Sequence, residues 1–145
     1  MKVTEYFLAK DLMCRCCGDL PAKEPQVVDF YKKLDELRSL CKFEISDAYR
    51  CPERDKKVSL NSATAGHGVH TMGVGVHIPC SVNTAHKILA NAFKVGFTGI
   101  GINQDGPYEL RFIHLDTITT EEGGIAHHGR PWVWCHRSEP SIYNY

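Results

Sequence analysis

The chain has 145 residues with seventeen basic and seventeen acidic side chains, so its formal net charge at pH 7 is zero. A chain of this length forms a single domain that buries about two thirds of its unfolded surface. Its evenly mixed charges argue against nucleic-acid binding. No apolar run approaches the roughly 20 residues of a spanning helix, which argues against a membrane span. The N-terminus lacks the apolar core of a signal peptide.

The seven cysteines are an odd number in a chain too long to be a disulfide-dependent mini-fold, so we expect mostly free thiols. Three of them, Cys14, Cys16 and Cys17, crowd together in an N-terminal arm at residues 1–22. A disulfide between one of these thiols and Cys51 is an alternative. A metal role is less favoured, because a lone Cys-Arg-Cys-Cys knuckle lacks the second pair of ligands that a structural zinc site needs.

Two amphipathic helices are predicted from apolar residues that recur every three or four positions. The first follows Pro25 and spans residues 26–41. The second follows Ser81 as its N-cap, ends at Gly96 and carries His86 on its outer face. The predicted core positions are Val27, Phe30, Tyr31, Leu34, Leu37 and Leu40 in the first helix, and Ala85, Ile88, Leu89, Ala92 and Phe93 in the second.

Alternating apolar and polar residues predict the strands. A strand at residues 43–49 places Arg50 at its end, and the polar residues 55–65 form a loop of the kind that rims active sites. A further strand is expected at residues 74–78, and a hairpin joins strands at 98–103 and 109–115. The predicted fold is α+β, a small, mainly antiparallel sheet with two packed helices, in one domain at residues 1–134 followed by a tail at 135–145.

The stretch at residues 66–78 contains three of the eight histidines interleaved with four glycines, which allow sharp turns that bring imidazoles together. A catalytic zinc ion takes three protein ligands. We select His70, His77 and His114, because the strand that holds His114 can pair beside the strand of His77. The remaining histidines are interpreted as solvated loop or surface residues, namely His67, His86, His127, His128 and His136.

Four blocks of the sequence resemble motifs of one protein family, and they occur in the same order as in that family. They are Ser-Asp-Ala-Tyr-Arg-Cys-Pro-Glu at 46–53, His-Thr-Met-Gly-Val-Gly-Val-His-Ile at 70–78, Phe-Thr-Gly-Ile-Gly at 97–101 and Arg-Phe-Ile-His-Leu-Asp at 111–116. The chain thereby resembles the phage-associated branch of the M-fifteen zinc peptidases, the D-alanyl-D-alanine carboxypeptidases and L-alanyl-D-glutamate endopeptidases of peptidoglycan. The resemblance extends from the cysteine-rich arm to Trp134, and it implies a hedgehog/D-Ala-D-Ala peptidase-like fold.

The resemblance also implies roles for individual residues. His70 and His114 correspond to zinc ligands, and Arg50 corresponds to a residue that faces the substrate. A planar guanidinium suits bidentate binding of a peptide carboxylate, such as a D-amino-acid end or a D-glutamate. The alternative for Arg50 is a salt bridge at the end of a strand.

The chain departs from the family pattern at two positions. His77 stands where the family has an aspartate ligand, and three histidines also form a known type of catalytic zinc site. Arg111 stands where many relatives have a carboxylate, which leaves Asp116 as the nearest acid. Asp116 is interpreted as the general base or as a partner that orients an imidazole. Weaker candidates for the base are Glu109, Glu121 and Glu122.

The implied function is a phage-encoded hydrolase, a zinc metallopeptidase that cuts peptidoglycan stem peptides. Such an endolysin or entry enzyme reaches the cell wall from the host cytoplasm through a holin, or acts as a virion component. The alternative is a non-catalytic wall-binding or structural component of a phage particle, whose partners are other phage structural proteins and which keeps the fold with an altered metal site.

Overall fold

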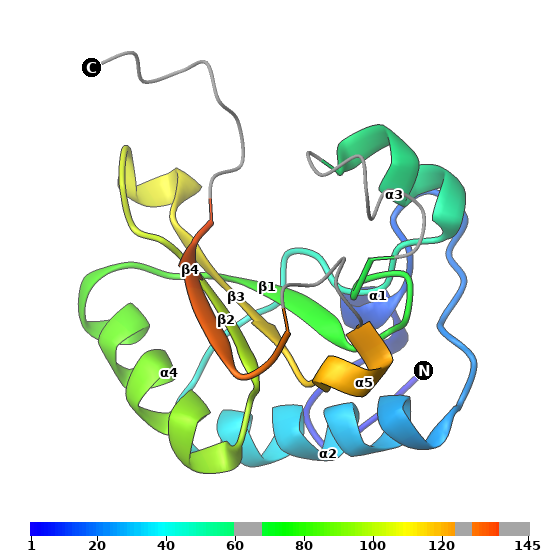
Figure 1. The fold of residues 1–145 in the computed structure, drawn as a ribbon, viewed down its shortest axis with the longest axis horizontal. Helices are drawn as coiled ribbons and strands as arrows, with labels where there is room; N and C mark the ends of the chain where they lie inside the picture. The colour runs from blue at the N-terminus through cyan, green and yellow to red at the C-terminus, as the bar shows by residue number, and fades with distance from the viewer. Residues whose placement is uncertain (60–67, 124–128, 137–145) are drawn as a thin grey trace.

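The computed structural model describes residues 1–59, 68–123 and 129–136, and it contains a four-stranded sheet with the strand order β1-β3-β2-β4 (Figure 1). The strands are β1 (Gly75–Pro79), β2 (Gly99–Asn103), β3 (Phe112–Asp116) and β4 (Trp132–Cys135). β3 pairs antiparallel with both β1 and β2, whereas β4 runs parallel to β2. The predicted α+β class and hairpin are confirmed, and β4 is an additional edge strand.

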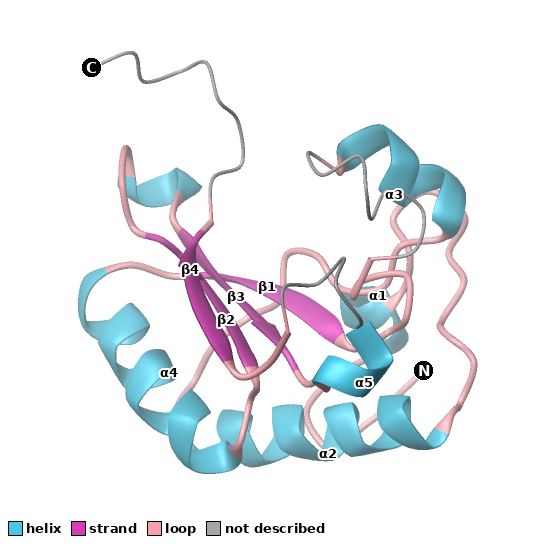
Figure 2. Cartoon of the chain, viewed as in Figure 1, coloured by secondary structure: helices cyan, strands magenta, loops and turns pink. Residues whose placement is uncertain are grey.

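Two long helices, α2 (Pro25–Leu40) and α4 (Val82–Val95), contact each other and lie on one side of the sheet (Figure 2). Both helices were predicted to within one or two residues. Gly96 ends α4 in the left-handed conformation, with φ 96°, as expected of a C-terminal glycine. Two predicted core positions are exposed instead, Phe93 at 60% and Leu40 at 53%. Phe93 falls about a third of a turn away from the buried positions of α4, since successive residues rotate by about 100°, and Leu40 is the last residue of α2.

The two faces of the sheet differ sharply in chemistry, because successive side chains of a strand point to opposite faces. One face carries apolar side chains that are 1% exposed or less and form the core with the helices, namely Val76, Ile78, Ile100, Ile113 and Leu115. The other face carries His77, His114 and Asp116. His77 and His114 are directly opposite in the register of β1 and β3, so the fold brings these two imidazoles together.

The segment at residues 43–49 is extended but is not the predicted strand. Within the described residues, its only bridge joins Asp47 to His77. Phe43 and Ile45 are buried in the core, but no strand of the sheet pairs with them. The predicted loop after it begins instead as helix α3 (Pro52–Val58). Proline at the first helical position, acids in the first turn and lysines in the last turn are the local signals for this helix.

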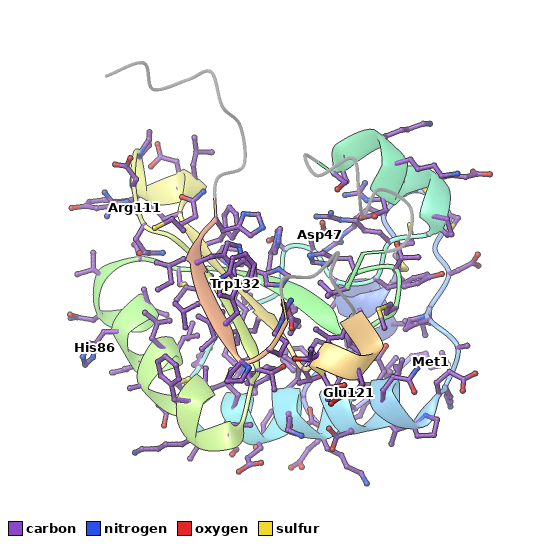
Figure 3. The ribbon with its side chains drawn as sticks, in the orientation of Figure 1. Met1, Asp47, His86, Arg111, Glu121 and Trp132 are labelled. Atoms are coloured by element: carbon purple, nitrogen blue, oxygen red, sulfur yellow. The ribbon has the colours of Figure 1, made fainter. Side chains whose placement is uncertain are left out.

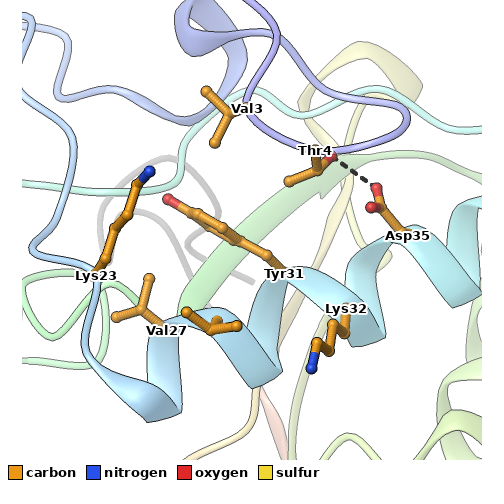
Figure 4. A pocket seen from close by; sticks show the side chains of 8 residues that line it. Val3, Thr4, Lys23, Val27, Tyr31, Lys32 and Asp35 are labelled. Atoms are coloured by element: carbon orange, nitrogen blue, oxygen red, sulfur yellow. Dashed lines mark hydrogen bonds between the residues drawn. The ribbon is translucent and has the colours of Figure 1, made fainter.

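The N-terminal arm packs against α2 and contains a short helix, α1 (Ala9–Leu12). The hydroxyl of Thr4 donates a 2.7 Å hydrogen bond to the carboxylate of Asp35, beside a pocket of about 270 Å³ (Figure 4). Burial raises the pKa of Tyr31 in this pocket to about 12. The pocket contains no histidine or cysteine and lies outside the predicted site. None of the helices described here is both long and apolar enough to span a membrane.

Candidate metal centre

The three predicted ligands come from three neighbouring parts of the chain. His70 lies in the turn before β1, His77 in β1 and His114 in β3. The ring centroids of His70 and His77 are 4.6 Å apart, and each is 5.2 Å from that of His114. One nitrogen of each ring lies within 4.8 Å of the others, so the three side chains form a group that can hold a metal ion.

Hydrogen bonds show which nitrogen each ring has available for a metal. Nδ1 of His70 lies 2.7 Å from the carbonyl oxygen of Ala48, so this nitrogen carries the proton and donates it. Nε2 of His70 is then an acceptor, and it lies 3.2 Å from Nε2 of His77. Two nitrogens bound to one tetrahedral zinc ion are about 3.3 Å apart, given zinc–nitrogen bonds of about 2.05 Å. The spacing of this pair therefore fits a shared ion.

In His114, Nδ1 is the nitrogen that remains available for a metal. Its Nε2 lies 2.9 Å from Oδ2 of Asp116, whereas its buried Nδ1 has no hydrogen-bond partner in the described structure. A buried polar atom without a partner costs free energy, and ligation of a metal ion removes that cost. The fit of the site to a metal ion rests on this unpartnered atom together with the spacing of the other two nitrogens.

The electrostatic surroundings keep two of the imidazoles neutral. Burial, which disfavours the charged form, is the largest cause that lowers the pKa of His70 and of His77 well below the ordinary value. The charge of Arg50 acts in the same direction on both rings. A neutral imidazole offers the lone pair that a metal ion needs.

Asp116 is fully buried behind His114 and bound at both oxygens. Arg130 donates from Nε to Oδ1 and from Nη2 to Oδ2, each at 2.9 Å. Burial by itself raises the pKa of Asp116, but the hydrogen bonds from His114 and Arg130 outweigh it and hold the pKa below its ordinary value. Gly99 makes room for this carboxylate, since a Cβ at that position would overlap it. This geometry favours the role of orienting His114.

Arg50 lies next to the histidines and is held by two acids. Its Nε donates to Asp47 at 2.7 Å and its Nη1 donates to Asp55 at 3.4 Å, while its side chain is 12% exposed. Its backbone N–H donates to the carbonyl of His70. These contacts agree with the alternative that Arg50 forms salt bridges. A contact between Arg50 and a substrate stays a proposal.

Sequence reasoning missed His136, which is not the solvated residue it was interpreted to be. Its ring stacks on His114 with centroids 5.5 Å apart and lies 5.1 Å from the ring of His77. Burial lowers the pKa of His136 to about 3. The signal for this position was the alternation Trp132, Trp134, His136, which places all three on the face of His114. Its backbone N–H extends the pairing with β2 by donating to Ile102.

Other predicted residues lie elsewhere or outside the described ranges. Glu109, in the 3-10 turn η1 (Tyr108–Leu110), is exposed, as is Glu121 in α5 (Thr120–Gly123). Arg111 donates to the carbonyl of Gly106 at an edge of the molecule away from Trp132 (Figure 3). His86 is exposed on α4, as predicted. The candidates outside the described residues are His67, His127, His128 and the side chain of Glu122.

The predicted boundary between domain and tail also shifts. Cys135 belongs to β4, and His136 packs on the histidine cluster, so both are part of the folded unit. Residues 137–145 lie outside the described structure.

No family model, curated protein or solved structure matches this chain. The function is therefore inferred from the geometry of the site and from the motifs of the sequence.

Proposed function

We propose that this protein is a zinc-dependent peptidase that cuts a bond in peptidoglycan stem peptides, as a D,D-carboxypeptidase or an L-alanyl-D-glutamate endopeptidase. The observation that carries the proposal is the group formed by His70, His77 and His114, whose ligand nitrogens lie within 4.8 Å of one another. Three histidines with an open fourth position are typical of catalytic rather than structural zinc.

The assignment of zinc and of peptidoglycan depends on the motifs of the sequence. Imidazole ligands suit zinc, copper, iron and nickel, and the four sequence blocks resemble a family of zinc peptidases. Zinc supplies Lewis-acid chemistry, which polarises a carbonyl group and favours ionisation of water near neutral pH.

The chain's own residues orient the site and bind the substrate in this proposal. The carbonyl of Ala48 and the carboxylate of Asp116 fix the tautomers of His70 and His114. Arg50 binds a carboxylate of the stem peptide. A guanidinium has five N–H donors, and the hydrogen bonds to Asp47 and Asp55 use only part of that capacity.

A specific observation favours a second candidate, a non-catalytic wall-binding or structural component of a phage particle. Asp116 is 0% exposed, and its two oxygens already accept hydrogen bonds from Arg130 and His114. It is therefore not placed to take a proton from water. A site that holds an ion beside a sequestered acid suits binding better than hydrolysis, and the fold alone does not require catalysis.

Metal analysis combined with digestion of purified stem peptides separates the two candidates. We expect the wild-type protein to release a cleaved peptide, detected by mass spectrometry, and His70→Ala to lose one equivalent of zinc together with the activity. His86→Ala is the matched control, because that histidine is exposed on α4.

Two results would contradict the enzyme proposal. A zinc-loaded wild-type protein that leaves stem peptides intact, while His77→Asp cuts them, would assign the chain to the non-catalytic candidate. A wild-type protein whose zinc content is unchanged by His70→Ala would remove the histidine metal centre itself.

A further inference from the structure

A second cluster of metal-ligating side chains lies outside the histidine site. The Sγ atoms of Cys14, Cys16, Cys17 and Cys51 all lie within 4.8 Å of one another, and all four are free thiols. Three come from the N-terminal arm, and the fourth is the residue that precedes helix α3. The sequence pattern did not predict this cluster, because its fourth cysteine, Cys51, is 37 residues beyond Cys14.

The distances between the sulfur atoms suit a single tetrahedral ion. Sγ of Cys16 lies 3.5 Å from Sγ of Cys14 and 3.3 Å from Sγ of Cys51. Four sulfurs at about 2.3 Å from one zinc ion are about 3.8 Å apart. Only shifts of a few tenths of an ångström in these two pairs separate the observed arrangement from a loaded site.

The surrounding backbone holds the cysteines in place by itself. A turn is closed by hydrogen bonds from Gly18 to the carbonyl of Cys14 and from Cys14 to the carbonyl of Asp19. The backbone N–H of Cys51 donates to Sγ of Cys14 at 3.3 Å, an arrangement that stabilises a negatively charged sulfur ligand. The cluster is therefore preorganised for a cation.

Further contacts tie the arm to the segment at residues 46–52. The N–H of Tyr49 donates to the carbonyl of Leu12, and Nη2 of Arg15 donates to the carbonyl of Ser46. The same segment supplies the carbonyl of Ala48 that holds His70. An ion bound by the arm and by Cys51 would clamp together the two parts of the chain that support this side of the histidine centre.

We propose that Cys14, Cys16, Cys17 and Cys51 form a closed, structural zinc site, separate from the histidine centre. Four thiolates complete a tetrahedral shell and leave no position for a substrate, which is typical of structural zinc. Thiolates are soft ligands and select zinc over magnesium or calcium. Cys16 and Cys17 are exposed, so an ion can reach the cluster from solvent. This inference stands whether or not the chain is a peptidase.

Cobalt substitution in the full-length protein tests the proposal. Reduced, metal-free wild-type protein is titrated with Co²⁺, and we expect one equivalent to produce a sulfur-to-cobalt charge-transfer band with the intense visible absorption of a tetrahedral site. His70→Ala should keep this band, because histidine ligands give no sulfur-to-cobalt transition. Added Zn²⁺ should abolish the band and raise the thermal midpoint of His70→Ala.

Matched variants locate the site. Cys51→Ser and Cys16→Ser should weaken and shift the charge-transfer band, because each removes one of the four thiolates. Cys135→Ser should keep it, because this exposed thiol lies on β4 outside the cluster. Since a cysteine variant can fail to fold, the wild-type titration is the decisive measurement.

A wild-type protein with all seven thiols reduced, as counted with a thiol reagent, that gives no sulfur-to-cobalt band would overturn the proposal. So would a disulfide between Cys16 and Cys51 in protein isolated under anaerobic, thiol-free conditions. Loss of the band in His70→Ala, or a band of unchanged position and intensity in Cys51→Ser, would likewise contradict the assignment. The histidine centre and the peptidase activity are measured separately, so their failure would leave this result intact.

Discussion

The orientation of His114 depends on a chain of two hydrogen-bonded side chains behind it. Asp116 accepts from His114 on one side and from the guanidinium of Arg130 on the other. His114 and Asp116 are two residues apart on one strand, so their common face follows from the sequence alone. Arg130 lies fourteen residues after Asp116, just before β4, and reaches Asp116 only because of how the folded chain is arranged. No pattern of neighbouring residues in the sequence predicts this contact.

Replacing Arg130 tests this chain of contacts. Arg130→Gln leaves a buried carboxylate without its cation, so we expect a loss of about 3–5 kcal/mol in the free energy of unfolding. We also expect zinc to bind about 10–100-fold more weakly, because His114 loses its support. Denaturant unfolding and competition with a chromophoric chelator measure the two effects. Arg111→Gln is the control, since the contacts of Arg111, with the carbonyl of Gly106 and the ring of Tyr108, lie at the edge of the molecule. Unchanged zinc affinity in Arg130→Gln would contradict the positioning role.

Helices and strands were predicted well where residues in the sequence mark their ends. Proline at the start of α2 and Gly96 after α4 are visible in the sequence, and the apolar spacing between them describes a helix. Residues 43–49 show the limit of this approach, because they alternate like a strand but form only one bridge to the part of the chain that the structure describes. A strand requires a partner, and whether a partner is present is decided outside the segment.

The corrected face of α4 can be tested by a pair of substitutions. Ile88 is fully buried, so Ile88→Ala should lower the free energy of unfolding by about 3 kcal/mol through lost apolar contacts and a cavity. Phe93→Ala removes a larger side chain, but one that is 60% exposed, and should cost less than about 1 kcal/mol. Chemical denaturation of both variants provides the comparison. Equal losses would show that Phe93 belongs to the core, as the sequence pattern predicted.

At the scale of the whole molecule, one segment connects the two candidate metal centres. Residues 46–52 contact the histidine group through the carbonyl of Ala48 and contribute Cys51 to the thiol cluster. Ions at the two centres would therefore stabilise the same folded state, each by binding the native chain and not the unfolded one.

Removal of metal should consequently destabilise the protein. An ion present at about 100 times its dissociation constant stabilises the native state by about 2.7 kcal/mol, which corresponds to a thermal midpoint higher by on the order of 10 °C in a domain of this size. We expect a chelator to lower the midpoint measured by circular dichroism. Zn²⁺ should restore it, and Mg²⁺ should not, because magnesium prefers oxygen ligands. A midpoint unchanged by the chelator would contradict stabilisation by metal at either centre.

The sequence by itself determined the two long helices, the hairpin of β2 and β3, and the common face of His114 and Asp116, because these follow from local periodicity and from proline and glycine at the ends of elements. It also singled out His70, His77 and His114, which the structure brings within reach of one ion. Only the tertiary structure decided the pairing of β4 with β2, the place of His136 beside the cluster, the bond of Arg130 to Asp116, and the approach of Cys51 to the N-terminal cysteines. Each of these joins residues far apart in the chain, and such contacts are set by how whole elements pack rather than by any local pattern.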